Sequence, residues 1–283
     1  MTFRSEGLVW LDQGGRGPGL VPAAEAALPV GDRGLLYGDG LFETVLIRSG
    51  GLPLLELHLE RLAASALALG IPCDLERVRA GALALAGSTG AGTATALAEQ
   101  ALRITLTRGV AASRGYAPPA EPSPTVLITR SPYQRPAGPL RTVTAGVRVW
   151  SESPLWRHKT LSALEKVLAR AEAVAAGADE ALLLNQHGRL AEGASANLFV
   201  VQDGRWITPP VSEGCLPGVM RRRMIALTGA RQEVLPPEAL AAAHGVYLTS
   251  ALMGCLPVST LDGRPLRLGP PPPRLEELLG SGA

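Results

Sequence analysis

The chain has 283 residues, of which 46% are hydrophobic and 18% are charged, and its formal net charge is only +2. This balance is ordinary for a folded globular protein and argues against intrinsic disorder. Basic residues do not cluster among aromatic ones, and the short run 221–223 falls inside a helical pattern, so we expect no nucleic-acid partner. The length fits one large domain or two of medium size.

The cysteines and the lengths of the apolar runs argue against further classes of protein. The three cysteines, Cys73, Cys215 and Cys255, are odd in number and widely spaced, so we expect neither a disulfide framework nor a metal site. A reducing, cytoplasmic location fits this pattern. The first 15 residues lack a basic head followed by an apolar run, and no uncharged apolar stretch reaches about 18 residues. We therefore predict neither export nor a membrane span.

The first part of the chain predicts a small α+β domain over residues 1–117. Strand patterns cover 8–11, 41–48 and 102–107, with a hairpin turn at 49–51. Between them, leucine and alanine recur at helical spacing from Leu55 to Leu69, and two alanine-rich helices are expected to follow.

A proline-rich break at 118–124 contains four prolines, which exclude a regular helix or a central strand. We place the domain linker there and predict a larger domain over 125–283. Strand patterns at 125–129, 142–150, 181–184 and 198–201 favour a mainly antiparallel, barrel-like sheet. Helices are expected to pack outside it, one of them with Leu161, Leu164, Leu168 and Ala171 on one face.

Two residues in the second part indicate a site for an aldehyde cofactor. Lys159 stands between a strand pattern and a helix pattern, and Glu192 follows 33 residues later in LAEGASANLFVV. A lysine can form an imine with an aldehyde, and its amine, once displaced, can act as a general base. A carboxylate beside a pyridine nitrogen keeps that nitrogen protonated, so that the ring of pyridoxal phosphate (PLP) can accept electrons. Both residue types are common on solvated surfaces, so neighbouring motifs have to support this interpretation.

Segments along nearly the whole chain resemble the class IV aminotransferases, the fold type IV family of PLP enzymes. YGDGLFETVLIRSGGLPLLELHLERL (37–62) resembles the opening strand, hairpin and first helix of that family, and ALRITLTRGVAASRGY (101–116) its central strand and substrate loop. WRHKTLSALEKVLAR and EGASANLFVV match its lysine and glutamate segments, and LPGVMRRRMI (216–225) and VYLTSALMGCLPV (246–258) its phosphate-binding parts. Several short motifs in order are more specific than any one alone. The resemblance implies an α+β, fold type IV enzyme with a small N-terminal α/β domain and a larger PLP-binding domain.

The resemblance also implies which residues contact the cofactor: catalytic Lys159, then Glu192, Arg61, Val219, Met220, Ser250 and Asn197. Val219 and Met220 begin a helix, where backbone amides and the helix dipole favour the phosphate dianion. Arg61 and Ser250 are expected to add to the phosphate site, and Asn197 to support the glutamate or its strand. Without the lysine and glutamate motifs, Arg61 would be interpreted as a solvated charge.

Other cofactors find no support in the sequence. The four histidines, His58, His158, His187 and His244, are scattered and lack the close His or Cys partners of a metal site. The paired glycines of YGDG and GGRGPG do not open a helix after a strand, as a dinucleotide fingerprint would. We therefore expect neither a metal nor NAD or ATP.

Three local features favour a lyase of this family that converts 4-amino-4-deoxychorismate into 4-aminobenzoate and pyruvate for folate synthesis. TRGVAASRGY resembles the loop of those lyases and lacks the Arg-x-His pattern of D-amino acid aminotransferases. Leu164 stands where branched-chain aminotransferases have tyrosine, and TSALM resembles the NALM of the lyases. Against this, YGDGLFET is shared with aminotransferases, and Glu43 replaces a threonine of some lyases.

The alternative is therefore a PLP-dependent aminotransferase acting on D-amino acids or branched-chain L-amino acids. A catalytically silent PLP protein would be expected to have lost the motifs, which are intact. A small substrate with amino and carboxylate groups needs cationic partners, for which Arg108 and Arg114 are candidates; the other interpretation of both is a solvated loop. The resemblance also implies a homodimer with the active site near the subunit interface.

Overall fold

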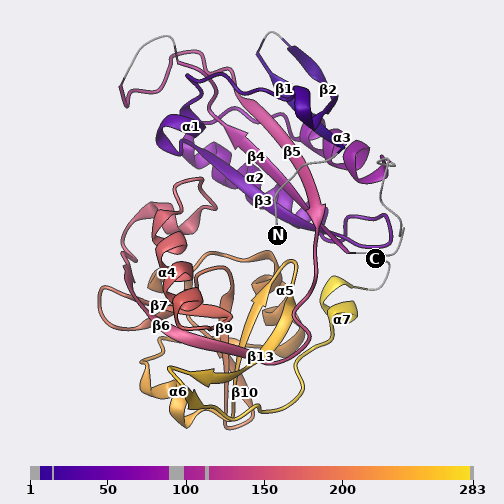
Figure 1. The fold of residues 1–283 in the computed structure, drawn as a ribbon. Coiled ribbons are helices and arrows are strands. Elements are labelled where there is room, and N and C mark those ends of the chain that lie inside the picture. Colours follow the sequence, from indigo (N-terminus) through magenta and orange to yellow (C-terminus); the bar gives the residue numbers. More distant parts are fainter. Residues whose placement is uncertain (1–6, 15, 89–98, 112–114, 281–283) are drawn as a thin grey trace. The chain divides into compact units, whose positions relative to one another are not determined.

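A computed structural model of the chain describes residues 7–14, 16–88, 99–111 and 115–280. The chain forms two compact units of comparable length. The first contains Met1–Gln134 and the short segment Lys159–Ser162, and the second contains Arg135–His158 and Ala163–Gly282. Figure 1 shows the helices and strands of each unit coloured along the sequence.

The first unit is built on an antiparallel sheet with the strand order β2-β1-β5-β4-β3. The strands are β1 (Leu8–Gln13), β2 (Arg16–Pro22), β3 (Gly40–Ile47), β4 (Gln100–Thr107) and β5 (Thr125–Pro132). The helices are α1 (Arg33–Tyr37), α2 (Leu55–Leu69) and α3 (Leu75–Gly87), with a 3-10 turn, η1, at Ala23–Glu25. β3 and β4 pair over their whole length, so the register fixes which side chains share a face.

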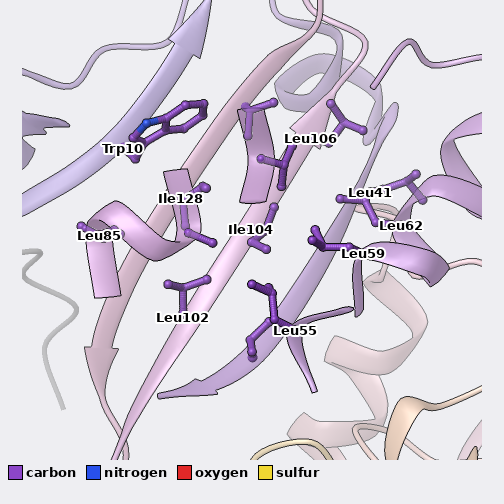
Figure 2. Close-up of a cluster of buried hydrophobic side chains, with 14 of the residues drawn as sticks. Trp10, Leu41, Leu55, Leu59, Leu62, Leu85, Leu102, Ile104, Leu106 and Ile128 are labelled. Atoms are coloured by element: carbon purple, nitrogen blue, oxygen red, sulfur yellow. The ribbon is translucent and has the colours of Figure 1, made fainter. Parts of the chain in front are cut away.

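The core of the first unit lies between this sheet and the two longer helices. Successive residues of a strand point to opposite faces, and Leu102, Ile104 and Leu106 of β4 are completely buried on one of them. Leu59 and Leu62 of α2 belong to the same cluster, which Figure 2 shows together with Trp10 and Leu85. The helical spacing of the leucines and the alternation of the strand therefore bury the same core from two sides.

The second unit is built on a larger mixed sheet with the order β11-β10-β9-β12-β13-β6-β7-β8, to which β14 adds beside β13. Its strands are β6 (Leu140–Val149), β7 (Glu180–Asn185), β8 (Leu190–Gly193), β9 (Asn197–Gln202), β10 (Arg205–Thr208), β11 (Arg231–Gln232), β12 (Gly245–Ser250), β13 (Gly254–Leu261) and β14 (Arg264–Pro265). β6 pairs in parallel with β7 and β13, whereas β9, β12 and β13 form antiparallel pairs. The parallel pair β6–β7 requires a crossover, which a helix provides.

Helices complete the second unit. They are α4 (Leu164–Ala175), α5 (Val219–Thr228), α6 (Glu238–Ala242) and α7 (Leu275–Leu279), with 3-10 turns η2 at Pro154–Arg157 and η3 at Val211–Glu213. α4 is the crossover between β6 and β7 and packs against both strands through Ala169 and Ala173.

The second sheet curls, so that its end strand β8 returns to β9. The backbone N–H of Gly193 donates to the carbonyl of Ala196 at 2.7 Å, and Asn197 at the start of β9 lies opposite Thr249 of β12. The end of β8, the start of β9 and the end of β12 therefore meet in one region. This curl gives the barrel-like sheet that the sequence predicted.

Two predictions differ from the structure. The linker was predicted at 118–124, but β5 inserts between β1 and β4, so the first unit continues to Gln134. The helix predicted to include Leu161 also differs, because α4 begins at Leu164. Leu164 and Leu168 are 67% and 51% exposed, and small alanines make the contact with the sheet. Two alanine-rich helices were expected after Leu69; α3 is one of them, and residues 89–98, which follow it, lie outside the described residues.

Candidate active site

Lys159 is held by backbone hydrogen bonds to the edge strand of the first sheet. The Phe42 N–H donates to the carbonyl of Lys159, and the Leu161 N–H donates to the carbonyl of Gly40, both at 2.9 Å. A Cβ on Gly40 would lie 2.5 Å from the carbonyl oxygen of Leu106 and 2.7 Å from the side chain of Leu161. Glycine at the start of β3 therefore permits the close approach that fixes the lysine segment.

Lys159 and the half-buried Arg103 both lie close to the ring of Phe42. Lys159 Nζ lies 4.3 Å from the centre of the Phe42 ring, and the guanidinium carbon of Arg103 lies 3.8 Å from it. Phe42 and Arg103 point away from the leucine core, on the opposite face of β3 and β4. Burial lowers the pKa of Arg103, and within the described part of the chain Arg103 forms no ion pair with a carboxylate. A desolvated cation beside the lysine is suited to bind an anion.

Glu43, on the helix side of β3, holds Arg61 and His58 of α2. Arg61 donates through Nε to Oε1 at 2.8 Å and through Nη2 to Oε2 at 2.6 Å, while His58 Nδ1 lies 2.7 Å from Oε2. The Glu43 side chain is 1% exposed. The bidentate contact fixes the guanidinium plane, so the predicted phosphate-binding arginine is oriented by a buried carboxylate.

The charge states within this cluster follow from its contacts. Burial raises the pKa of Glu43, but the Arg61 charge and the hydrogen bonds from His58 and Arg61 outweigh burial and hold that pKa at about 2. Burial lowers the pKa of His58, and the hydrogen bond to Glu43 offsets only part of this change. An ionised carboxylate only accepts hydrogen bonds, so we assign the His58 proton to Nδ1, which donates to Glu43.

In the second unit, Glu192 is buried at the end of β8 and accepts hydrogen bonds from three groups. Oε2 accepts from the Leu216 N–H at 2.9 Å and from Asn197 Nδ2 at 3.2 Å, and Oε1 accepts from Lys166 Nζ at 2.8 Å. Asn197 also donates to the Leu216 carbonyl at 2.8 Å. The curl of the sheet thus brings the predicted glutamate and asparagine into direct contact, and Lys166 joins them.

The predicted phosphate-binding amides follow directly on this cluster. Helix α5 begins at Val219, only three residues after Leu216, and the first N–H groups of a helix have no acceptor within it. A Cβ on Gly218 would lie 2.0 Å from Oδ1 of Asn197, so only glycine allows the helix to start here. Ser250, which ends β12, follows Thr249, the residue opposite Asn197.

The two predicted substrate arginines have different positions in the structure. Arg108 is buried and donates through Nε to Asp39 at 2.8 Å and through its two Nη atoms to the carbonyls of Gly70 and Leu69, at the end of α2. Its guanidinium therefore caps a helix in this structure. Arg114 lies outside the described residues.

Arg33 is a second partner of Asp39 that the sequence did not reveal. Its Nε donates to Asp39 at 2.7 Å, and its Nη atoms donate to the carbonyls of three consecutive residues, 115–117. Burial raises the pKa of Asp39, but hydrogen bonds from Arg108 and Arg33 outweigh it and lower that pKa. Arg33 therefore links residues 115–117, at the end of the loop that carries the RGY motif, to Asp39, which directly precedes β3.

Sequence reasoning missed Glu43, Arg103 and Lys166 as members of these clusters. Each has a feature in the sequence whose meaning becomes clear only in the folded structure. Glu43 and Arg103 are charged residues in strands that also supply the apolar core, and Lys166 is the third residue of α4. Their partners come from distant segments, which no local pattern identifies.

The described part of the chain shows no arrangement of residues suited to another kind of site. It contains no group of three or more His, Cys, Asp or Glu residues placed to hold a metal ion. None of its helices has both the length and the apolar character needed to cross a membrane. Cys215 lies near Glu192, but burial and, secondarily, the Glu192 charge raise the pKa of its thiol to about 12, which disfavours thiolate chemistry.

The residues present fit PLP. In the second unit, Glu192 is a buried carboxylate suited to a pyridine nitrogen. Its partner Leu216 lies three residues before the start of helix α5, and that helix start is suited to a phosphate. The first unit supplies a lysine fixed by backbone hydrogen bonds and an arginine fixed by a carboxylate. Taken unit by unit, these features match what an aldehyde cofactor such as PLP needs from a protein.

Comparison with known proteins identifies the family. The model of the amino-transferase class IV family matches residues 40–261. The putative branched-chain-amino-acid aminotransferase of Methanocaldococcus jannaschii is 32% identical over 254 residues, 86% of each chain. The aminodeoxychorismate lyase of Vibrio harveyi is 32% identical over 249 residues, covering 83% of this chain and 88% of the lyase. The crystal structure of 4-amino-4-deoxychorismate lyase from Pseudomonas aeruginosa matches with a TM-score of 0.77 and 37% identity, over 93% of this chain and 94% of the other.

The chain belongs to the class IV aminotransferase family, whose enzymes depend on PLP. The predicted family, fold type and cofactor are thereby confirmed.

The Glu43 cluster makes a prediction for stability against pH. The pKa of Glu43 is lowered from an ordinary value of 4.5 to about 2. The ionised carboxylate therefore stabilises the fold above pH 4.5, and this contribution is lost as the pH falls toward 2. The shift corresponds to about 3 kcal/mol. We expect the free energy of urea unfolding to fall more steeply over this range in the wild type than in Glu43→Gln.

The exposed carboxylate of Glu25 provides the control. Glu25→Gln should keep the wild-type pH dependence. Equal slopes in wild type and Glu43→Gln would mean that Glu43 does not stabilise the fold through its charge.

Proposed function

We propose that the protein is a 4-amino-4-deoxychorismate lyase that forms 4-aminobenzoate and pyruvate for folate synthesis. The observation that carries this proposal is the match to the Pseudomonas lyase over nearly the whole chain, together with the RGY loop and the TSALM segment. The pair of cations on Phe42 supports a substrate that carries a carboxylate.

PLP, when bound, supplies an electron sink for a carbanion beside the substrate nitrogen. The Lys159 amine would remove the proton from the substrate carbon that carries the amine. Glu192 would keep the ring nitrogen protonated, and Asn197 and the Leu216 N–H would hold the carboxylate of Glu192 in position. Loss of the enolpyruvyl group as pyruvate then leaves an aromatic product, which makes the step favourable.

The phosphate contacts are assigned as part of the same proposal. The amides of Val219 and Met220 would bind phosphate oxygens at the start of α5, and the Ser250 hydroxyl and Arg61 would add to them. Glu43 would set the orientation in which Arg61 meets the phosphate. We keep Arg114 as a candidate for a substrate carboxylate, and Arg108 could serve only by giving up its contacts to the end of α2.

An aminotransferase acting on D-amino acids or branched-chain L-amino acids is the alternative, and the relative from Methanocaldococcus supports it. The same residues would serve, because Lys159 would move the proton from the substrate carbon to the cofactor instead of allowing elimination. The fold does not separate the two reactions.

Product analysis separates the two activities. With 4-amino-4-deoxychorismate, the lyase is expected to release 4-aminobenzoate and pyruvate in equal amounts, and Lys159→Ala should abolish both. Glutamate formed from D-alanine or L-leucine with 2-oxoglutarate, without any 4-aminobenzoate from the first substrate, would establish an aminotransferase instead.

Replacing Arg103 tests the carboxylate site. If its guanidinium binds a substrate carboxylate, Arg103→Gln should raise KM by about tenfold or more, the effect of losing a charged hydrogen bond, with a smaller change in kcat. Arg77→Gln, which removes an exposed arginine of the first unit, is the control and should leave KM unchanged. An unchanged KM in Arg103→Gln would place the carboxylate elsewhere.

We further propose that the protein is a homodimer and that a second copy covers α4. Its outer face carries Leu164, Val167, Leu168 and Val174, which are 51% to 67% exposed. An apolar helix face of this kind is typical of an interaction surface. The cytoplasmic location that the three free cysteines favour is part of the same proposal.

The dimer proposal is tested by placing a charge on this face. We expect Leu168→Asp to reduce the mass in solution, measured by light scattering, from twice that of the chain toward that of one chain. Leu67→Asp, at an 84% exposed leucine of α2, should keep the wild-type mass. A wild-type protein that is monomeric at micromolar concentration would exclude the dimer.

A further inference from the structure

Glu192 has a cationic partner on α4. Lys166 Nζ lies 2.8 Å from Oε1, while Leu216 and Asn197 both donate to Oε2. The Glu192 side chain is 3% exposed and the Lys166 side chain 29%. The ammonium group also lies 5.3 Å from the centre of the Trp156 ring. Lys166 thus reaches from the surface to a buried carboxylate oxygen.

Lysine is an exceptional choice in this chain. Of its 27 lysine and arginine residues only two are lysines, Lys159 and Lys166. An arginine can hold a carboxylate with two parallel N–H bonds, whereas a lysine makes a point contact on a flexible stem. A lysine can therefore leave Oε1 more readily than an arginine.

Lys166 lies at the wrong end of the cofactor to replace Lys159. The aldehyde of a pyridoxal ring is attached opposite the ring nitrogen. An amine within hydrogen-bond distance of the carboxylate that holds this nitrogen is therefore far from the aldehyde. Lys166 is a partner of Glu192 and not a second imine-forming lysine.

We propose that Lys166 competes with the ring nitrogen of PLP for Oε1 of Glu192 and thereby limits the affinity of the protein for its cofactor. This inference rests on the proposed contact between Glu192 and the ring nitrogen. Two cations at one carboxylate oxygen repel each other. Binding of the cofactor therefore has to displace Lys166.

Substitutions at this position are expected to act in opposite directions. Lys166→Met removes the competitor and should lower the Kd for PLP by about fivefold to tenfold, the effect of a partly exposed ion pair. Lys166→Gln should lower it in the same way and provides a second test if the methionine variant folds poorly. Lys166→Arg should raise the Kd by about tenfold, because a bidentate partner is harder to displace.

Two further variants complete the set. Arg170→Met removes a cation one turn further along α4, where the guanidinium contacts Asp179 and Glu180 instead of Glu192; its Kd should stay within about twofold of wild type. Glu192→Gln removes the shared carboxylate and should weaken PLP binding by about tenfold or more.

The measurement is a titration of the full-length, PLP-stripped protein, with the Kd taken from quenching of tryptophan fluorescence. The melting temperature is recorded without and with PLP. Lys166→Met leaves a buried carboxylate with neutral donors only, so it should melt lower than wild type without PLP and gain more on adding it.

The outcomes separate this inference from the proposed function. If Lys166→Met and Lys166→Gln both leave the Kd unchanged or raise it, while Glu192→Gln still weakens binding, the competition is wrong. If Glu192→Gln leaves the Kd unchanged, the contact to the ring nitrogen fails, and the competition fails with it. Neither result depends on the reaction, because no turnover is measured.

Discussion

Burial of two carboxylates is the constraint on which the functional residues of both units depend. Glu43 and Glu192 have side chains only 1% and 3% exposed, and an ionised carboxylate withdrawn from water costs several kcal/mol unless cations and hydrogen bonds surround it. Arg61 and His58 meet this need at Glu43, and three donors meet it at Glu192. The groups that we propose to bind and orient a cofactor are therefore also groups that the fold needs for its own stability.

The arginines show why charge alone does not mark a binding residue. Arg33 and Arg108 both hold Asp39, and their remaining donors satisfy backbone carbonyls at a loop and at a helix end. Arg103 instead lies on an aromatic ring with no carboxylate partner among the described residues. The difference between a structural and a binding guanidinium lies in how its donors are used, and that depends on segments far away in the sequence.

The sequence predicted what short-range patterns determine. The strand and helix of the first core follow from alternation in β4 and leucine spacing in α2, and the family motifs led to the cofactor. The predictions that failed, and the residue that was missed, concern which distant segment a helix, strand or side chain contacts. An apolar stripe on α4 does not reveal whether it packs against its own sheet or remains exposed, and alanines made the contact instead. The prolines at 118–124 marked an irregular segment, but only strand pairing shows that β5 belongs to the first sheet. Lys166 went unnoticed because its partner follows on a strand beyond α4.

The path of the chain between the two units has a consequence for how Lys159 is held in place. The chain leaves the first unit after Gln134, returns to it for the four residues Lys159–Ser162, and then enters the second unit again. Lys159 thus belongs to the later sequence, but backbone hydrogen bonds and an isolated bridge between Leu41 and Thr160 join its segment to β3, which lies more than a hundred residues earlier. The lysine segment follows all five strands of the first sheet in the sequence, so the position of Lys159 depends on a sheet edge that is complete without it. Because these hydrogen bonds lie at the edge of the sheet, they can break locally without loss of the pairing between β3 and β4.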